Sequence, residues 1–184
     1  RYLIVGTTNL NAQRPVFWDM GRIAQSKSAA ALDLFRNVLL ASSALPGIFP
    51  PVALKVRADG KTFYEEHVDG GPTRQVFLSP AGLSFKQIDA AVGYKMKRKL
   101  WIIRNGKLTP EYSIAPPTAL SIAARSLETL TKNQGIGDLI RMWDKANADG
   151  IDYNLASIPS DFEHPHPRPF DHAYMKALYT RGYE

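Results

Sequence analysis

Along this chain of 184 residues, hydrophobic side chains recur with the period of a strand in some segments and of a helix in others. This alternation limits the folds open to the chain more than any other feature. A continuous apolar run at residues 2–5 is typical of a strand buried on both faces of a parallel sheet. Residues 52–56 alternate between apolar and other side chains, which predicts a half-buried strand. Asp59-Gly60 then predicts a hairpin turn, with the returning strand at residues 62–68.

Helical spacing of apolar residues appears in four further segments, at residues 28–43, 118–130, 136–143 and 174–178. Thr118 is the expected N-cap of the second of these helices. Gly135 is predicted to end that helix and so to separate it from the third.

Three more short strands are predicted at residues 88–92, 100–103 and 153–158. A second hairpin turn is expected at Asn105-Gly106, and the proline-rich residues 159–169 should form an extended connection. Because strands, hairpins and helices alternate without internal repeats, the sequence predicts an α/β fold with a mixed sheet. A chain of this length suits one domain, and no linker divides it.

The chain contains no cysteine, which excludes disulfide frameworks, thiolate zinc sites and cysteine nucleophiles. No stretch approaches the roughly 20 apolar residues of a membrane span. The chain begins at Arg1 without a methionine and runs directly into an apolar strand. We therefore expect it to be a fragment of a longer protein.

The net charge of +6 indicates a modestly basic surface with a local cluster at Lys95, Lys97, Arg98 and Lys99. This cluster fits a solvated loop before a strand, and it also fits a contact for anionic lipid head groups. A second group, at His164, His166 and His172, has a His-x-His spacing that can bind zinc. Its prolines and the lack of a further ligand at a fixed spacing favour a solvated loop.

Motifs for nucleophilic catalysis and for phosphate binding are missing from the chain. It has no Gly-x-Ser-x-Gly nucleophile elbow and no glycine-rich phosphate loop. The remaining candidate is Asp69-Gly70-Gly71, at the end of a predicted strand, preceded by His67. Two glycines let the backbone turn tightly and approach a ligand, so Asp69 could serve as a carboxylate base, although such a tripeptide is more often a simple turn.

Three ordered motifs resemble the second half of the patatin-like phospholipase family. They comprise Gly6-Thr7-Thr8-Asn9-Leu10-Asn11 with Gln13-Arg14-Pro15-Val16, then Ala44-Leu45-Pro46-Gly47-Ile48-Phe49-Pro50-Pro51-Val52, then His67-Val68-Asp69-Gly70-Gly71. Residues 121–126, 134–139 and 170–175 are similar to a bacterial branch of that family, so the resemblance covers nearly the whole chain.

The resemblance implies a three-layer α/β/α fold and hydrolysis of fatty acyl esters in phospholipids or neutral lipids. It implies a serine–aspartate dyad without histidine, metal or cofactor, in which Asp69 is the base and Gly70 and Gly71 belong to its motif. Residues 1–184 would then be the C-terminal part of one catalytic domain, and the nucleophilic serine and the oxyanion loop would precede Arg1. Leu45, Ile48, Phe49 and Val52 are candidates for a lipid path or for the core.

Three hypotheses follow from these observations. The first is the base-bearing part of a lipid acyl hydrolase that has an acyl-ester lipid substrate and a peripheral membrane contact, and no nucleic-acid partner. The second is a patatin-fold lipid-binding or interaction module that has lost its nucleophile. The third is an unrelated α/β domain. The sequence leaves open the lipid class and the compartment, although bacterial members of the family are often exported or membrane-associated.

Overall fold

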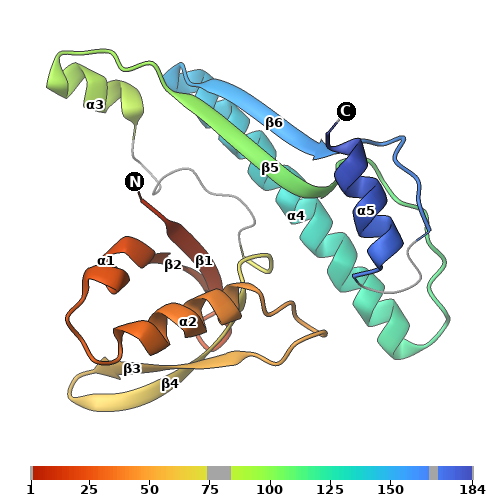
Figure 1. Ribbon diagram of the computed structural model, residues 1–184, viewed down its shortest axis with the longest axis horizontal. Helices are drawn as coiled ribbons and strands as arrows, with labels where there is room; N and C mark the ends of the chain where they lie inside the picture. The colour runs from red at the N-terminus through yellow and green to blue at the C-terminus, as the bar shows by residue number, and fades with distance from the viewer. Residues whose placement is uncertain (1, 74–83, 166–169, 184) are drawn as a thin grey trace. The chain divides into compact units, whose positions relative to one another are not determined.

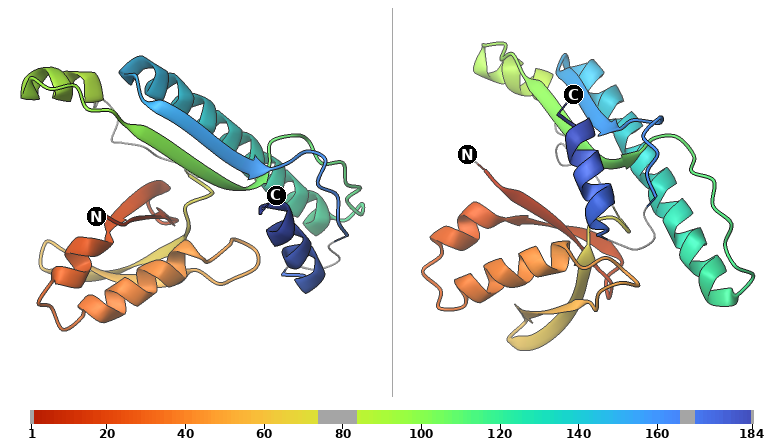
Figure 2. Two further views of the ribbon diagram at one scale, coloured as in Figure 1. Left: turned by 45° about the horizontal axis from the view of Figure 1, so that its top comes forward. Right: turned by 45° about the vertical axis from the view of Figure 1, so that its right-hand side comes forward.

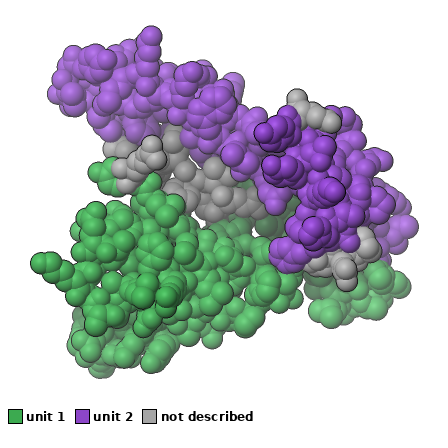
Figure 3. Space-filling view, in the orientation of Figure 1, with its two compact units in different colours: residues 1–78, 116–140 green, residues 79–115, 141–184 purple. Residues whose placement is uncertain are grey.

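The computed structural model describes residues 2–73, 84–165 and 170–183, and the chain divides into two compact units (Figure 3). Unit 1 comprises Arg1–Leu78 and Pro116–Ile140, and unit 2 comprises Ser79–Ala115 and Arg141–Glu184. Both contain helices and strands, so the predicted α/β class is confirmed at that level. Parallel and antiparallel pairing both occur, but in separate sheets rather than in the one mixed sheet expected from the sequence.

Unit 1 is built on a four-stranded antiparallel sheet with the order β2-β1-β4-β3 (Figure 1). Its strands are β1 (Ile4–Asn9), β2 (Arg14–Asp19), β3 (Val52–Ala58) and β4 (Lys61–Asp69). Two helices, α1 (Met20–Gln25) and α2 (Ala31–Ser42), lie on one face of this sheet (Figure 2). The buried side chains of Met20, Val38 and Leu54 form the core between them.

Unit 2 contains a two-stranded parallel sheet of β5 (Lys99–Lys107) and β6 (Asp152–Ile158). Its helices are α3 (Phe85–Val92), α5 (His172–Arg181) and the last turns of α4 (Ala119–Asp149), which continues from unit 1. Asp149 holds the start of α3, because its carboxylate accepts hydrogen bonds from the Ser84 hydroxyl and from the Phe85 backbone N–H. The Phe85 N–H, which has no partner within the first turn of α3, thereby gains one.

Several predicted elements are confirmed. The hairpin turn at Asp59-Gly60 joins β3 to β4, and both residues have the positive φ that a type I′ turn requires (50° and 73°). Thr118 caps α4, because its hydroxyl oxygen accepts the Ser121 backbone N–H at 3.2 Å. Helix α2, strand β6 and helix α5 also lie where helical or strand periodicity predicted them. No helix in the described ranges has the length and apolar character needed to cross a bilayer.

The start and the environment predicted for the strand at residues 2–5 were wrong. Strand β1 starts at Ile4, both of its neighbours are antiparallel, and Tyr2 and Leu3 before it are exposed. The buried part of this strand is instead the polar segment 7–9, in which the hydroxyls of Thr7 and Thr8 and the Oδ1 of Asn9 form hydrogen bonds within unit 1, while Asn9 Nδ2 has no partner among the described residues. Strand β2 and helix α1 were not predicted at all.

The strand predicted at residues 88–92 is the second half of helix α3. Ser84 caps this helix through a 3.4 Å hydrogen bond from the Gln87 N–H, and Gly93 ends it with a φ of 73°. The apolar residues Phe85, Ile88 and Val92 fit helical spacing, and the strand interpretation overlooked this because it began only at Ile88.

Two glycine signals were also misread. Strand β5 runs through Asn105-Gly106, which lies at a register irregularity against β6 and makes no hairpin turn. Gly135 does not end a helix: α4 continues unbroken for 31 residues, and Gly135 is buried within it. One glycine in a helix interior costs only about 1 kcal/mol, which the many other residues of a 31-residue helix can offset.

Substitution of Met20 by Ala should lower the free energy of unfolding by about 2–5 kcal/mol, because it leaves a cavity in the core of unit 1. The Met20 side chain is 1% exposed, whereas that of Met175 on α5 is 43% exposed and provides a control of the same type. Urea titrations of the two variants beside the unsubstituted chain measure the difference. Equal losses for Met20→Ala and Met175→Ala would contradict the assigned core.

Candidate functional site

Asp69 is the last residue of β4 and lies where three segments distant in sequence come together. In the sheet register it pairs with Thr7 of β1. Its backbone N–H donates a 3.1 Å hydrogen bond to the carbonyl of Ala44, just beyond the end of α2. These contacts join the three motifs that carry the family resemblance, and Asp69 belongs to the last of them.

The turn after Asp69 is built around its carboxylate. The Gly71 backbone N–H donates a 3.0 Å hydrogen bond to Asp69 Oδ1. A Cβ at position 71 would lie only 3.1 Å from that same oxygen, so a side chain there would crowd the carboxylate. The Gly70 carbonyl accepts the Thr73 N–H at 3.2 Å, and the Thr73 hydroxyl shares a 2.8 Å hydrogen bond with that of Thr8 on β1. A side chain at position 71 would therefore require the Asp69 carboxylate to shift by a few tenths of an ångström.

Partial burial raises the pKa of the Asp69 carboxyl above its ordinary value, and the hydrogen bond from Gly71 opposes this rise. Burial has this effect because it disfavours the charged form, whereas a donor to the carboxylate favours it. A carboxylate with a raised pKa is a stronger base than a solvated one. Asp69 is thus partly removed from water and held in one orientation.

His67 lies two residues earlier on the same face of β4 and is fully buried. Its Nδ1 is 2.9 Å from the Thr7 hydroxyl oxygen, and its Nε2 is 3.4 Å from a carboxylate oxygen of Glu65. Trp18 packs edge-on against the imidazole, with 5.7 Å between ring centroids, and donates its indole N–H to the Thr7 oxygen at 2.8 Å. Because an ionised carboxylate only accepts, Nε2 carries the proton and the Thr7 hydroxyl donates to Nδ1.

Desolvation lowers the pKa of His67, and the hydrogen bond and charge of Glu65 act in the opposite direction. The neutral imidazole has both nitrogens engaged by protein groups. The imidazole therefore connects β1 to β4 within the buried part of unit 1. Neither of its nitrogens is available to act on a substrate. Sequence reasoning missed Thr7, Trp18 and Glu65, although the inward positions of Thr7 and His67 on their strands were a usable signal.

The other sequence candidates do not gather at Asp69. Leu45, Ile48 and Phe49 are exposed, whereas Val52 packs against the core. The described residues contain no group of three or more potential metal ligands, and His166 lies outside them.

The basic cluster provides fewer free charges than its sequence indicated. Arg98 forms a two-armed ion pair with Asp89, at 2.8 and 2.6 Å, and lies over the Phe85 ring. Lys99 lies 3.8 Å from the carboxylate of Asp152 on β6. Lys95 and Lys97 are exposed in the connection between α3 and β5.

Comparison of the chain with protein-family models, curated protein sequences and solved structures gives no match. The patatin-like assignment therefore stays a prediction carried by the motifs of the sequence.

Substitution of Gly71 by Ala should destabilise the chain by about 1–3 kcal/mol, because the new methyl group crowds the Asp69 carboxylate and disturbs the hydrogen bond that it accepts from the backbone N–H of residue 71. The same substitution in an Asp69→Ala background should have a much smaller effect, since no carboxylate remains to be displaced. Chemical denaturation of the four proteins in this double-mutant cycle measures the coupling. Additive effects would show that Gly71 is needed for another reason.

Proposed function

We propose that Asp69 is the general base of a serine–aspartate dyad that hydrolyses acyl esters of lipids. The convergence of the three family-like motifs at Asp69 is the observation that carries this proposal. The partly desolvated, oriented carboxylate supports it, because such a group can accept the proton of a serine hydroxyl during attack on an ester.

The proposal requires two groups that the 184 residues do not supply in a recognisable form. One is the serine on a nucleophile elbow, and the other is a set of backbone donors for the tetrahedral oxyanion, each typically worth about 3–4 kcal/mol. We propose that polypeptide outside these residues contributes both, in a patatin-like α/β/α domain of which this chain is the C-terminal part. Gly70 and Gly71 would keep the backbone close to the reacting groups.

In the polypeptide that carries both the serine and this chain, Asp69→Asn should lower ester turnover about 10²–10⁴-fold, because an amide cannot accept the serine proton. The fold should persist, because Asn Oδ1 can still accept the Gly71 N–H. Initial rates on a lipid ester, with thermal melting in parallel, measure both effects.

Asp59→Asn is the matched control, since Asn readily adopts the φ of 50° found in that hairpin turn. The isolated chain should show no turnover above buffer. If the Asp69→Asn protein melted normally and retained most of its turnover, Asp69-Gly70-Gly71 would be a simple turn without a catalytic role.

We propose, as a second candidate, a lipid-surface binding module without catalysis. Residues 94–103 favour it, because exposed Tyr94 and Met96 alternate there with Lys95 and Lys97, and the exposed side chains of Trp101 and Ile103 follow on β5. Aromatic and basic side chains together suit the boundary between anionic head groups and acyl chains.

The chain should adsorb weakly to vesicles that contain anionic lipid, and added salt should reverse most of the binding because the Debye length falls to about 3 Å at 1 M. Lys95→Glu with Lys97→Glu should weaken adsorption more than Arg57→Glu with Lys61→Glu, two exposed residues on the β3–β4 hairpin. Cosedimentation with neutral and anionic vesicles gives the comparison. Equal binding to both kinds of vesicle would count against this candidate.

A further inference from the structure

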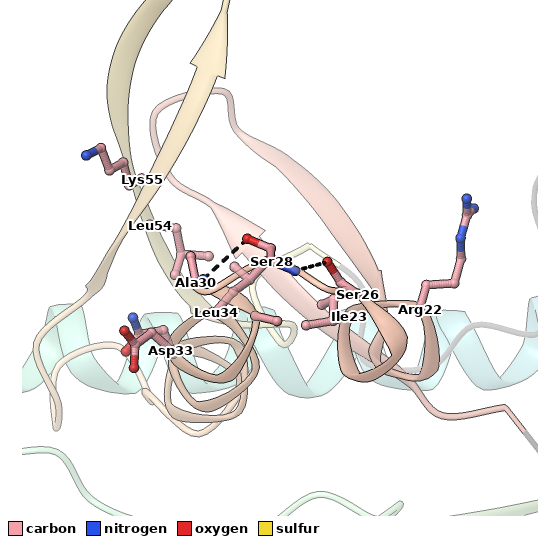
Figure 4. A pocket seen from close by; sticks show the side chains of 11 residues that line it. Arg22, Ile23, Ser26, Ser28, Ala30, Asp33, Leu34, Leu54 and Lys55 are labelled. Carbon is pink, nitrogen blue, oxygen red and sulfur yellow. Dashed lines mark hydrogen bonds between the residues drawn. The ribbon is translucent and has the colours of Figure 1, made fainter.

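Unit 1 contains a cavity at the opposite end of α2 from Asp69. The cavity has a volume of about 500 Å³ and lies between the end of α1, the first turns of α2 and the middle of β3 (Figure 4). This volume falls within the ~300–1,000 Å³ typical of small-molecule sites. Helix α2 has 12 residues, so about 18 Å of helix separates the two places.

The floor of the cavity is apolar. Ile23, Leu34 and Leu54 converge on it from α1, α2 and β3 (Figure 4). All three belong to the hydrophobic core of unit 1 or pack against it. An apolar group that entered the cavity would therefore extend the core and leave water.

The rim of the cavity is rich in hydrogen-bond donors. Ser26 Oγ accepts the Ser28 N–H at 3.2 Å, and Ser28 Oγ accepts the Ala30 N–H at 3.3 Å. Each hydroxyl still has its proton to donate, to water or to an acceptor atom of a ligand. Asn37 also lines the cavity, and its side-chain amide contains both a donor and an acceptor.

The charge of the rim is positive on balance. Arg22 and Lys55 line the cavity from two sides and Asp33 is the carboxylate among its lining residues (Figure 4). The long side chains of Arg22 and Lys55 are exposed, so they can turn towards an anion at the rim. The N-terminus of α2 also lines the cavity through Ala30 and Ala31, and the positive end of the helix dipole there is partly offset by Asp33 in the first turn.

From this apolar floor and donor-rich, positive rim, we infer that the cavity binds a small amphipathic oxyanion. Its hydrocarbon part lies against Ile23, Leu34 and Leu54, and its oxygens meet the hydroxyls of Ser26 and Ser28. The site does not involve Asp69 and goes beyond the proposed hydrolysis.

Titration calorimetry of the chain with decanoate, below its micelle concentration, tests the inference. One decanoate should bind per chain, and each CH₂ removed down to butyrate should weaken binding up to about fourfold. Decanol should bind at least about tenfold more weakly, because it lacks the charge that the rim attracts. Decyl sulfate distinguishes two kinds of oxyanion site. It should bind about as well as decanoate if the rim binds any oxyanion, and much more weakly if the rim binds carboxylates alone. Both results fit the inferred class.

Variants locate the site. Lys55→Glu should weaken decanoate binding about tenfold, whereas Lys61→Glu, the same change at the first residue of β4, should leave it within about twofold. Both lysines are exposed, so both variants should melt like the unsubstituted chain. Ser26→Ala with Ser28→Ala should also weaken binding. Methyl NMR shifts confined to Ile23, Leu34 and Leu54 would support the site.

Three results would overturn the inference: no decanoate binding, decanol binding as tight as decanoate binding, or methyl shifts only at exposed apolar residues elsewhere. Loss of decanoate binding in Lys55→Glu together with full ester turnover in the longer polypeptide would separate this site from the proposed dyad. Asp69→Asn should leave decanoate binding unchanged.

Discussion

The buried imidazole of His67 is the contact on which the arrangement of unit 1 depends. A polar ring inside a protein is tolerated only when its nitrogens are paired, and here Thr7 and Glu65 pair them while Trp18 packs against the ring edge. A slip of one residue between β1 and β4 would turn Thr7 to the other face and leave the imidazole without its donor. The network thus fixes the register that places Asp69 beside β1.

Two opposing effects act on the pKa of the Asp69 carboxyl. Burial disfavours its charge, and the Gly71 N–H stabilises that charge through a short, fixed turn. A fully solvated carboxylate would be a weaker base, and a fully buried one without a donor would stay protonated. A methyl group at position 71 would lie 3.1 Å from Asp69 Oδ1, so the same turn that donates to the carboxylate also limits the space around it.

Helix α2 connects the two regions for which we propose roles. Val38 and Ala41 anchor it to the sheet, the connection beyond its C-terminus accepts the Asp69 N–H through Ala44, and its first turns line the apolar cavity. Because the buried face of the helix is shared, large changes in the core should disturb both regions. Substitutions on the exposed rim, such as those at Lys55, should affect the cavity alone.

The sequence by itself determined the features that depend on neighbouring residues. Asp59-Gly60 specified a type I′ turn because both positions need a positive φ, and Thr118 specified a helix start because its hydroxyl reaches a backbone N–H three residues away. Asp69-Gly70-Gly71 was identified as a turn bearing a carboxylate for the same local reason. Only the tertiary structure decided that Asn105-Gly106 stays within a strand, that Gly135 stays within a helix, and that polar residues 7–9 are buried. The first and the last of these outcomes depend on partners far away in the chain, β6 for Asn105-Gly106 and His67 for Thr7, and the energy of such long-range contacts outweighs local preference.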